Sequence, residues 1–111
     1  MQVGFADVRS QNLFNSSREL VRAFGPENAR VIRRRLDDLR AVPSLEDARK
    51  LPGHLEELKG NRKGQFSMRL LGGRRLIFMP AAVPLPTKPD GGLDWVQIRE
   101  ITVLNVEDYH D

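Results

Sequence analysis

The residue types best suited to proton transfer lie at the end of the chain, in the run Glu107-Asp108-Tyr109-His110-Asp111. An imidazole titrates near neutral pH and can carry a proton, whereas a phenol can stack on a nucleobase or donate a hydrogen bond. Arginine and lysine side chains upstream can hold phosphate. This combination indicates RNA chemistry without a metal ion. The alternative interpretation is that the tail is a solvated, frayed C-terminus.

Three basic clusters precede this tail, at Arg33-Arg34-Arg35, Arg62-Lys63 and Arg74-Arg75. The whole chain has 18 Lys and Arg against 15 Asp and Glu, a formal net charge of +3, so its total charge says little about its partners. The clustering is more informative, because most acids fall in segments predicted to be helical, where they can pair with neighbouring bases. Phosphate and an acidic protein both fit these clusters as ligands.

The length and composition predict a single globular domain over residues 1–111. We expect a cytoplasmic protein with no membrane partner, because the chain has neither a bilayer-spanning apolar run nor an export signal at its start. It has no cysteine and only two histidines, His54 and His110, which excludes disulfides and thiolate metal sites and argues against a zinc centre. We therefore expect no metal and no cofactor.

The first half of the chain is predicted to be helical, because its apolar residues recur close to the 3.6-residue period of a helix. Residues 2–5 can form a short first strand. One helix is expected to end at Gly25, and the S-x-x-E pattern from Ser16 to Glu19 is typical of a helix N-terminus. Ser44 is expected to cap one further short helix.

Between these segments, a helix is predicted from Pro26 up to Pro43, because proline favours the first helical position. Its apolar stripe consists of Ala29, Ile32, Leu36 and Leu39. Much of the arginine run is also explained as ordinary helix surface, since Arg33 and Arg34 each have an aspartate four residues later.

After residue 53 the apolar period changes from 3.6 to 2, which is typical of strands. Residues 65–71, 74–79 and 95–106 are expected to form consecutive antiparallel strands. Residues 80–92 contain four prolines and are expected to form an irregular, exposed connection. This order predicts an α+β fold, in which two or three N-terminal helices pack on one face of an antiparallel sheet. The other face is left open for a ligand.

Gly72 and Gly73 suit a two-residue hairpin, because both can adopt positive φ. In such a hairpin Leu70 faces Arg75, which places Arg75 on an apolar face of the sheet. That face carries Phe66, Met68, Leu70 and Ile77. Arg75 then either pairs with a carboxylate inside the protein or receives an external anion.

Three motifs in the C-terminal half carry a resemblance to a known family: ELKGNRKGQFS at residues 57–67, RLIF at residues 75–78 and VEDYH at residues 106–110. As a set they resemble HigB-type toxins of the RelE/ParE superfamily. The resemblance implies a RelE-like fold and a ribosome-dependent mRNA endoribonuclease. Members cut by 2′-hydroxyl attack on the adjacent phosphate, leaving a 2′,3′-cyclic phosphate and a free 5′-hydroxyl.

The resemblance also implies a role for individual residues. Lys59 and Arg75 would stabilise the crowded phosphorane, and His110 would transfer a proton. Tyr109 would stack on or orient the nucleotide, and Asp108 would position His110 or the sugar. Phosphate contacts are expected from Arg62, Lys63, Arg69 and Arg74.

The chain departs from the family pattern at two places. Many relatives have histidine two residues before the L-K-G motif, where this chain has Glu56, and its own His54 lies two positions earlier. Glu56 can act as the base instead, although the ordinary pKa of a glutamate, about 4.3, makes it weaker unless burial raises that pKa. The alternatives are a solvated surface acid for Glu56 and a polar turn residue for His54. The connection over residues 80–92 is also longer than in many relatives.

The implied partners are a cognate antitoxin of the helix-turn-helix type, the bacterial ribosome with its mRNA, and operator DNA indirectly through the antitoxin. Two other functions stay open. One is a non-catalytic gyrase inhibitor like the ParE branch, which lacks the D-Y-H tail. The other is an antitoxin or DNA-binding regulator, which would need a recognition helix where the chain shows late strands.

Overall fold

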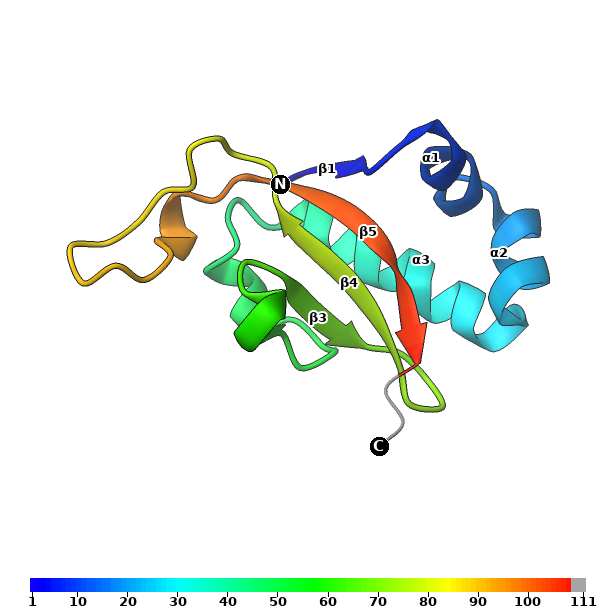
Figure 1. Cartoon of the computed structure of the whole chain (residues 1–111). Coiled ribbons are helices and arrows are strands. Elements are labelled where there is room, and N and C mark those ends of the chain that lie inside the picture. The colour runs from blue at the N-terminus through cyan, green and yellow to red at the C-terminus, as the bar shows by residue number, and fades with distance from the viewer. Residues whose placement is uncertain (109–111) are drawn as a thin grey trace.

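The computed structural model describes residues 1–108, so the predicted site residues Tyr109 and His110 lie outside the described residues, as does Asp111. The fold is α+β, with three α-helices packed against a five-stranded sheet (Figure 1). The helices are α1 (Val8–Phe14), α2 (Ser17–Phe24) and α3 (Pro26–Ala41). The strands are β1 (Gln2–Phe5), β2 (Glu56–Glu57), β3 (Phe66–Arg69), β4 (Arg74–Pro80) and β5 (Glu100–Asp108).

The sheet has the strand order β1-β5-β4-β3-β2, and β3, β4 and β5 form the predicted antiparallel meander. The predicted α+β class is confirmed, and the sheet is mixed, because β1 pairs parallel with β5 at one edge. The whole helical layer lies between β1 and the meander in sequence, so the chain can return to the sheet with either strand direction. The two-residue strand β2, which the sequence analysis did not predict, extends the opposite edge.

The predicted helix boundaries at Pro26 and Gly25 are confirmed, but the helix expected before Gly25 is two helices. Ser16 accepts a hydrogen bond from the Glu19 amide at 3.1 Å and caps α2, as the capping pattern predicted. Asp7 caps α1 by accepting from the Ser10 amide at 2.7 Å, and this bond lowers the pKa of the Asp7 carboxyl. A second cap inside the segment therefore divides it.

The core lies between α3 and the sheet, and the predicted stripe of α3 is buried. Phe66 and Phe78 are cross-strand partners whose rings stack with centroids 5.8 Å apart, and both are fully buried. Burying side chains of this size contributes roughly 1.5–3 kcal/mol each. The sheet residues packed in the same cluster include Met68, Leu76, Ile101 and Val103.

The last strand begins later than predicted, at Glu100, because residues before it are held by contacts within the fold. Trp95 opens the 3₁₀ turn η3 (Trp95–Gln97) and donates its indole N–H to Glu57 Oε1 at 3.0 Å. Its ring packs edge-on against Phe66 at 5.1 Å between centroids, and the Arg49 guanidinium lies 3.7 Å above it. These contacts draw Trp95 away from an extended path.

Two shorter segments also bear on the predictions. The short helix expected after Ser44 is the 3₁₀ turn η1 (Asp47–Lys50), and the Ser44 hydroxyl donates to Asp47 Oδ2 at 2.8 Å. Pro80 is the last residue of β4, and the connection after it, over residues 81–92, is mostly exposed and irregular, as expected; Thr87 forms an isolated bridge with Leu93. Within residues 1–108 no helix is long and apolar enough to cross a membrane.

The register of the β3–β4 hairpin differs by one residue from the predicted one. Arg69, and not Leu70, is the partner of Arg75, and Met68 is the partner of Leu76. A one-residue shift moves a side chain to the other face of the sheet. Arg75 therefore projects from the face opposite Phe66 and Met68, and its predicted place among those apolar side chains was wrong.

Candidate functional site

The face of the sheet away from α3, the open face, is covered at Ser67 and Ile77, which are buried, and carries a row of charged residues next to them. Arg69, Arg75 and Glu107 are successive cross-strand partners on β3, β4 and β5. Direct partners in antiparallel strands project to the same face, with Cβ atoms about 4.5–5.5 Å apart. Arg69 is exposed, whereas Arg75 is partly covered and its Nη1 atom is buried.

A short 3₁₀ turn, η2 (Gly60–Arg62), places a third arginine on this row. The turn lies in front of β3, on the side of the sheet opposite α3 (Figure 1). Arg62 makes two hydrogen bonds to the Glu107 carboxylate, from Nη1 at 3.0 Å and from Nη2 at 2.8 Å. Its Nε donates to Gln65 Oε1 at 2.8 Å. Both charged side chains are about 30% exposed, so this bidentate pair orders the turn above the sheet.

The two lysines of the L-K-G motif region flank this turn. Lys59 is the residue before η2 and Lys63 is the residue after it, and both are exposed. The carbonyl of Lys59 accepts a hydrogen bond from the Arg62 amide at 3.2 Å, which fixes the backbone of Lys59 beside the row. The structure therefore brings Arg62, Arg69 and Arg75 to one face, with the backbone of Lys59 next to the turn.

Glu56 lies on the same face but at its edge. It pairs with Ser67, whose next partner is Ile77 of β4, so its side chain projects to the same side as that of Arg75. Two strand spacings separate β2 from β4, a distance of about 10 Å. Glu56 is exposed. His54 is also exposed and has a φ of 52°, as expected of a polar turn residue.

Arg74 and Asp108 lie on the helical side of the sheet, which separates them from the row. Their Nε and Oδ1 atoms are 3.4 Å apart, and the Arg74 guanidinium carbon lies 5.9 Å from the centre of the Phe24 ring in α2. Because neighbouring residues on a strand project to opposite faces, Arg74 and Arg75 serve different surfaces. The sequence analysis treated Arg74 and Arg75 as one basic cluster, but the structure places their side chains on opposite faces of the sheet.

The arginine run on α3 divides in the same way. Arg33 and Arg34 are exposed, whereas Arg35 turns toward the β3–β4 hairpin. The predicted pair between Arg33 and Asp37 was wrong: in the described part of the chain Asp37 pairs with Arg40, at 3.6 Å. An acid N-terminal to its base is the more favourable order on a helix.

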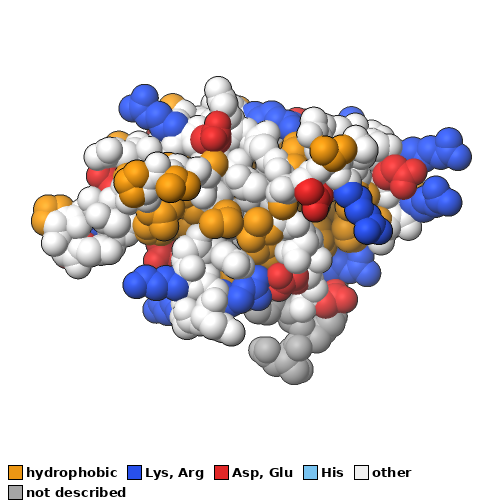
Figure 2. Space-filling view, turned by 45° about the horizontal axis from the view of Figure 1, so that its top comes forward, with side chains coloured by type: hydrophobic (Ala, Val, Ile, Leu, Met, Phe, Trp, Pro, Cys, Tyr) orange, Lys and Arg blue, Asp and Glu red, His pale blue; other side chains and the backbone are white. Residues whose placement is uncertain are grey.

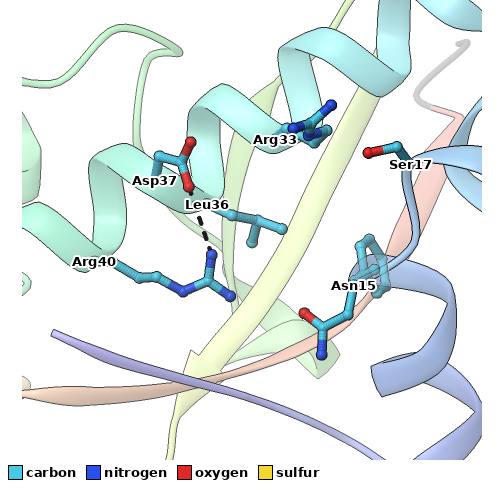
Figure 3. Close-up of a pocket in the computed structure, with 7 residues that line it drawn as sticks. Asn15, Ser17, Arg33, Leu36, Asp37 and Arg40 are labelled. Carbon is cyan, nitrogen blue, oxygen red and sulfur yellow. Dashed lines mark ion pairs between the residues drawn. The ribbon is translucent and has the colours of Figure 1, made fainter.

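A small polar hollow of about 180 Å³ lies beside this ion pair, between α3 and the junction of α1 and α2 (Figure 3). Asn15 and Ser17 line it from the junction, and Arg33 and Arg40 line it from α3. None of the residues predicted to act on RNA lies in it. The hollow is on the helical side and is separate from the row on the open face.

The open face holds more basic than acidic side chains. One of its acids, Glu107, was given no individual role by the sequence analysis. Glu107 was part of the tail motif, and its pairing with Arg62 depends on the sheet register. The bases of this face are Arg62, Arg69 and Arg75, with Lys59 next to the turn, and its acids are Glu56 and Glu107. Lys63 lines a separate hollow with Glu57, Leu85 and Thr87. In one view of the surface, apolar side chains gather along the middle, and basic and acidic side chains intermingle along the lower edge (Figure 2).

This arrangement suits an anionic, extended ligand more than a small molecule. Guanidinium groups bind phosphate through paired N–H donors, and three of them here project from adjacent strands or the turn above them. Among residues 1–108 no group of three His, Asp or Glu side chains is placed to hold a metal ion. No protein-family model matches the chain, and a search of curated proteins finds no significant match.

Proposed function

We propose that the chain is a ribosome-dependent mRNA endoribonuclease, the toxin of a toxin–antitoxin pair. The observation that supports this most is the row of Arg69, Arg75 and Glu107 on the open face, with Arg62 bound beside it. The row ends on β5, and β5 continues in sequence into Tyr109 and His110. Glu107, the first acid of the tail motif, thus lies with these cations on one face of the sheet.

Cleavage of RNA by its own 2′-hydroxyl needs three kinds of group: a base for that hydroxyl, cations around the phosphorane and an acid for the departing 5′-oxygen. Arg75 and Lys59 supply the cations in this proposal. Arg62 shares its charge between Glu107 and the phosphate, and its main effect is to hold Lys59 over the sheet. Lys63 and Arg69 contact phosphates on either side of the bond that is cut.

The strand order supports a division between base and acid. Glu56 is on β2 at one edge of the face, Arg75 is on β4, and His110 follows β5. In-line attack places the attacking and leaving oxygens on opposite sides of phosphorus. In this proposal Glu56 acts as the base from the β2 side of Arg75, and His110, which follows β5 in sequence, acts as the acid. Tyr109 stacks on the nucleotide.

Arg74 and Asp108 take part less directly in this scheme. Their ion pair lies on the helical side, where it anchors the end of β5 to β4. Asp108 therefore positions His110 through the backbone. The partners that follow from the proposal are a ribosome in the cytoplasm, the message in its decoding centre, and an antitoxin that binds the toxin and, through its own helix-turn-helix, operator DNA.

The proposal predicts that a message is cut within its coding region when purified protein is added to translating ribosomes. The same message without ribosomes is expected to be cut at least about a hundredfold more slowly, because orientation on the ribosome supplies much of the rate. Primer extension on both samples measures the two rates.

Two outcomes would count against the proposal. Equal cleavage of free and ribosome-bound message would remove the dependence on the ribosome. Intact RNA together with inhibition of gyrase in the same preparation would instead support a function like that of the ParE branch.

A further inference from the structure

Beyond the end of β2, the backbone groups on the outer edge of β3 form hydrogen bonds with side chains of α3 and with the loop before β2. β2 pairs only with Phe66 and Ser67 of β3. Farther along that edge, the Arg69 amide donates to the Gly53 carbonyl at 2.7 Å, and the Arg69 carbonyl accepts from Arg35 Nε at 3.1 Å. Backbone groups that would otherwise face solvent are thus held by α3 and by the loop before β2.

Asn28 of α3 holds the next residue on this edge with both ends of its amide. Its Oδ1 accepts from the Leu71 amide at 2.8 Å, and its Nδ2 donates to the Leu71 carbonyl at 3.2 Å. A side-chain amide that takes both backbone groups of one residue imitates a neighbouring strand. These bonds join residues 43 positions apart in the sequence.

The Leu71 amide is the group on which the hairpin register depends. In a two-residue hairpin across Gly72 and Gly73, the Arg74 carbonyl would accept from the Leu71 amide. In this structure the Arg74 carbonyl accepts from the Leu70 amide at 2.8 Å, while the Arg74 amide still donates to the Leu71 carbonyl at 3.3 Å. Next to the turn, the two registers therefore differ in which amide donates to the Arg74 carbonyl, and Asn28 Oδ1 supplies an acceptor for the Leu71 amide in place of that carbonyl.

Arg35 stabilises the same arrangement one step farther along β3. Gly53 has a φ of 110°, and a Cβ atom added there would lie 2.6 Å from Arg35 Nε. Glycine at this position therefore leaves room for the guanidinium to reach the Arg69 carbonyl. Partial burial of the Arg35 side chain lowers its pKa, because a charged guanidinium is less stable away from water.

We propose that Asn28 and Arg35 are positioning residues, which fix the β3–β4 register and thereby keep Arg69 and Arg75 on the open face. In the alternative register Arg75 would be opposite Leu70. Because β4 is also paired with β5, the side chains of β3 would change face, and Arg75 would lose Arg69 as its neighbour in the row. The consequence for catalysis rests on the proposed function, in which Arg75 contacts the phosphate. The effect of Asn28 and Arg35 on the register does not depend on the proposed function.

The test compares Asn28→Ala with Asn28→Asp and with the control Asn12→Ala, in the full chain. Asn12 is an exposed asparagine of α1 with no hydrogen bond to the hairpin. Aspartate at position 28 keeps an acceptor for the Leu71 amide and lies in the first turn of α3, where an acid is tolerated. The readouts are the cross-strand Hα–Hα NOE between Arg69 and Arg75 and the kcat and KM of message cleavage.

We expect Asn28→Ala to weaken the NOE and to lower kcat by about tenfold or more, with little change in KM, because small displacements of catalytic groups cost up to about a hundredfold. Asn28→Asp is expected to restore both readouts only in part, because it keeps the acceptor for the Leu71 amide and loses the donor to the Leu71 carbonyl. Asn12→Ala is expected to leave both unchanged. A full NOE in Asn28→Ala would overturn the inference, whatever the rate. A lost NOE with an unchanged rate would leave the register argument intact and would contradict the proposed role of Arg75.

Discussion

Replacing Arg75 with alanine is expected to slow cleavage of ribosome-bound message by about 10²–10³-fold, the usual effect of removing one preorganised donor to a developing negative charge. Arg75 is at the centre of the open-face row, between Arg69 and Glu107, and its guanidinium is held partly out of water. Single-turnover cleavage measures the effect. Growth arrest caused by expression of the chain without its antitoxin is expected to be relieved.

Two other arginines serve as comparisons for this variant. Arg99 is exposed just before β5 and belongs to no part of the proposed site, so Arg99→Ala is expected to cut at the normal rate. Arg74→Ala is expected to have a smaller effect than Arg75→Ala, because Arg74 lies on the helical side with Asp108. Full toxicity of Arg75→Ala would show that the row is not the catalytic centre.

Replacing His110 with asparagine is expected to slow cleavage by about 10²–10⁴-fold, the usual contribution of general acid–base catalysis. If His110 donates the proton to the 5′-oxygen, the active form is the imidazolium. The rate of the unmodified chain then falls as rising pH removes the proton from this imidazolium. The variant is expected to lack this decline, and a pH–rate profile of both chains measures it.

The second histidine provides the matched control. His54 has a positive φ, which asparagine also adopts readily, so His54→Asn is expected to keep both the fold and the pH profile. A profile that changes in His54→Asn and stays the same in His110→Asn would transfer the proton-transfer role to the loop before β2.

The parts of the fold that could be predicted from the sequence are those decided by local rules. The α3 helix begins at Pro26 as expected, Ser16 caps α2, and the two glycines form a turn with φ of 66° and 77°. Each depends on residues within a few positions of one another. The α+β class follows from the order of these elements.

The parts that were missed depend on contacts between distant segments. β5 begins later than predicted because Trp95 binds Glu57, and the hairpin register differs from the predicted one because Asn28 binds Leu71. Periodicity contains no information about either contact. The same register decides which side chains of β3 share a face with Arg75. The residue type of Arg75 therefore suggested its role, but the sequence predicted the wrong face for its side chain.

In the candidate site, too, the residue types could be predicted from the sequence, whereas their arrangement could not. The residue types for phosphate binding were predicted as a set, but alternation along β4 and β5 separates Arg74 and Asp108 from Arg75. Only the three-dimensional register shows that Arg62 binds Glu107 across the open face.

The most direct test of the central idea, that the open face and the tail cut RNA through its own 2′-hydroxyl, uses a message with one 2′-deoxynucleotide immediately 5′ to the cleaved bond. With ribosomes present, the all-ribose message is expected to give an upstream fragment ending in a 2′,3′-cyclic phosphate, and the deoxy message is expected to stay intact at that position. Cleavage of both messages at the same rate would contradict the account.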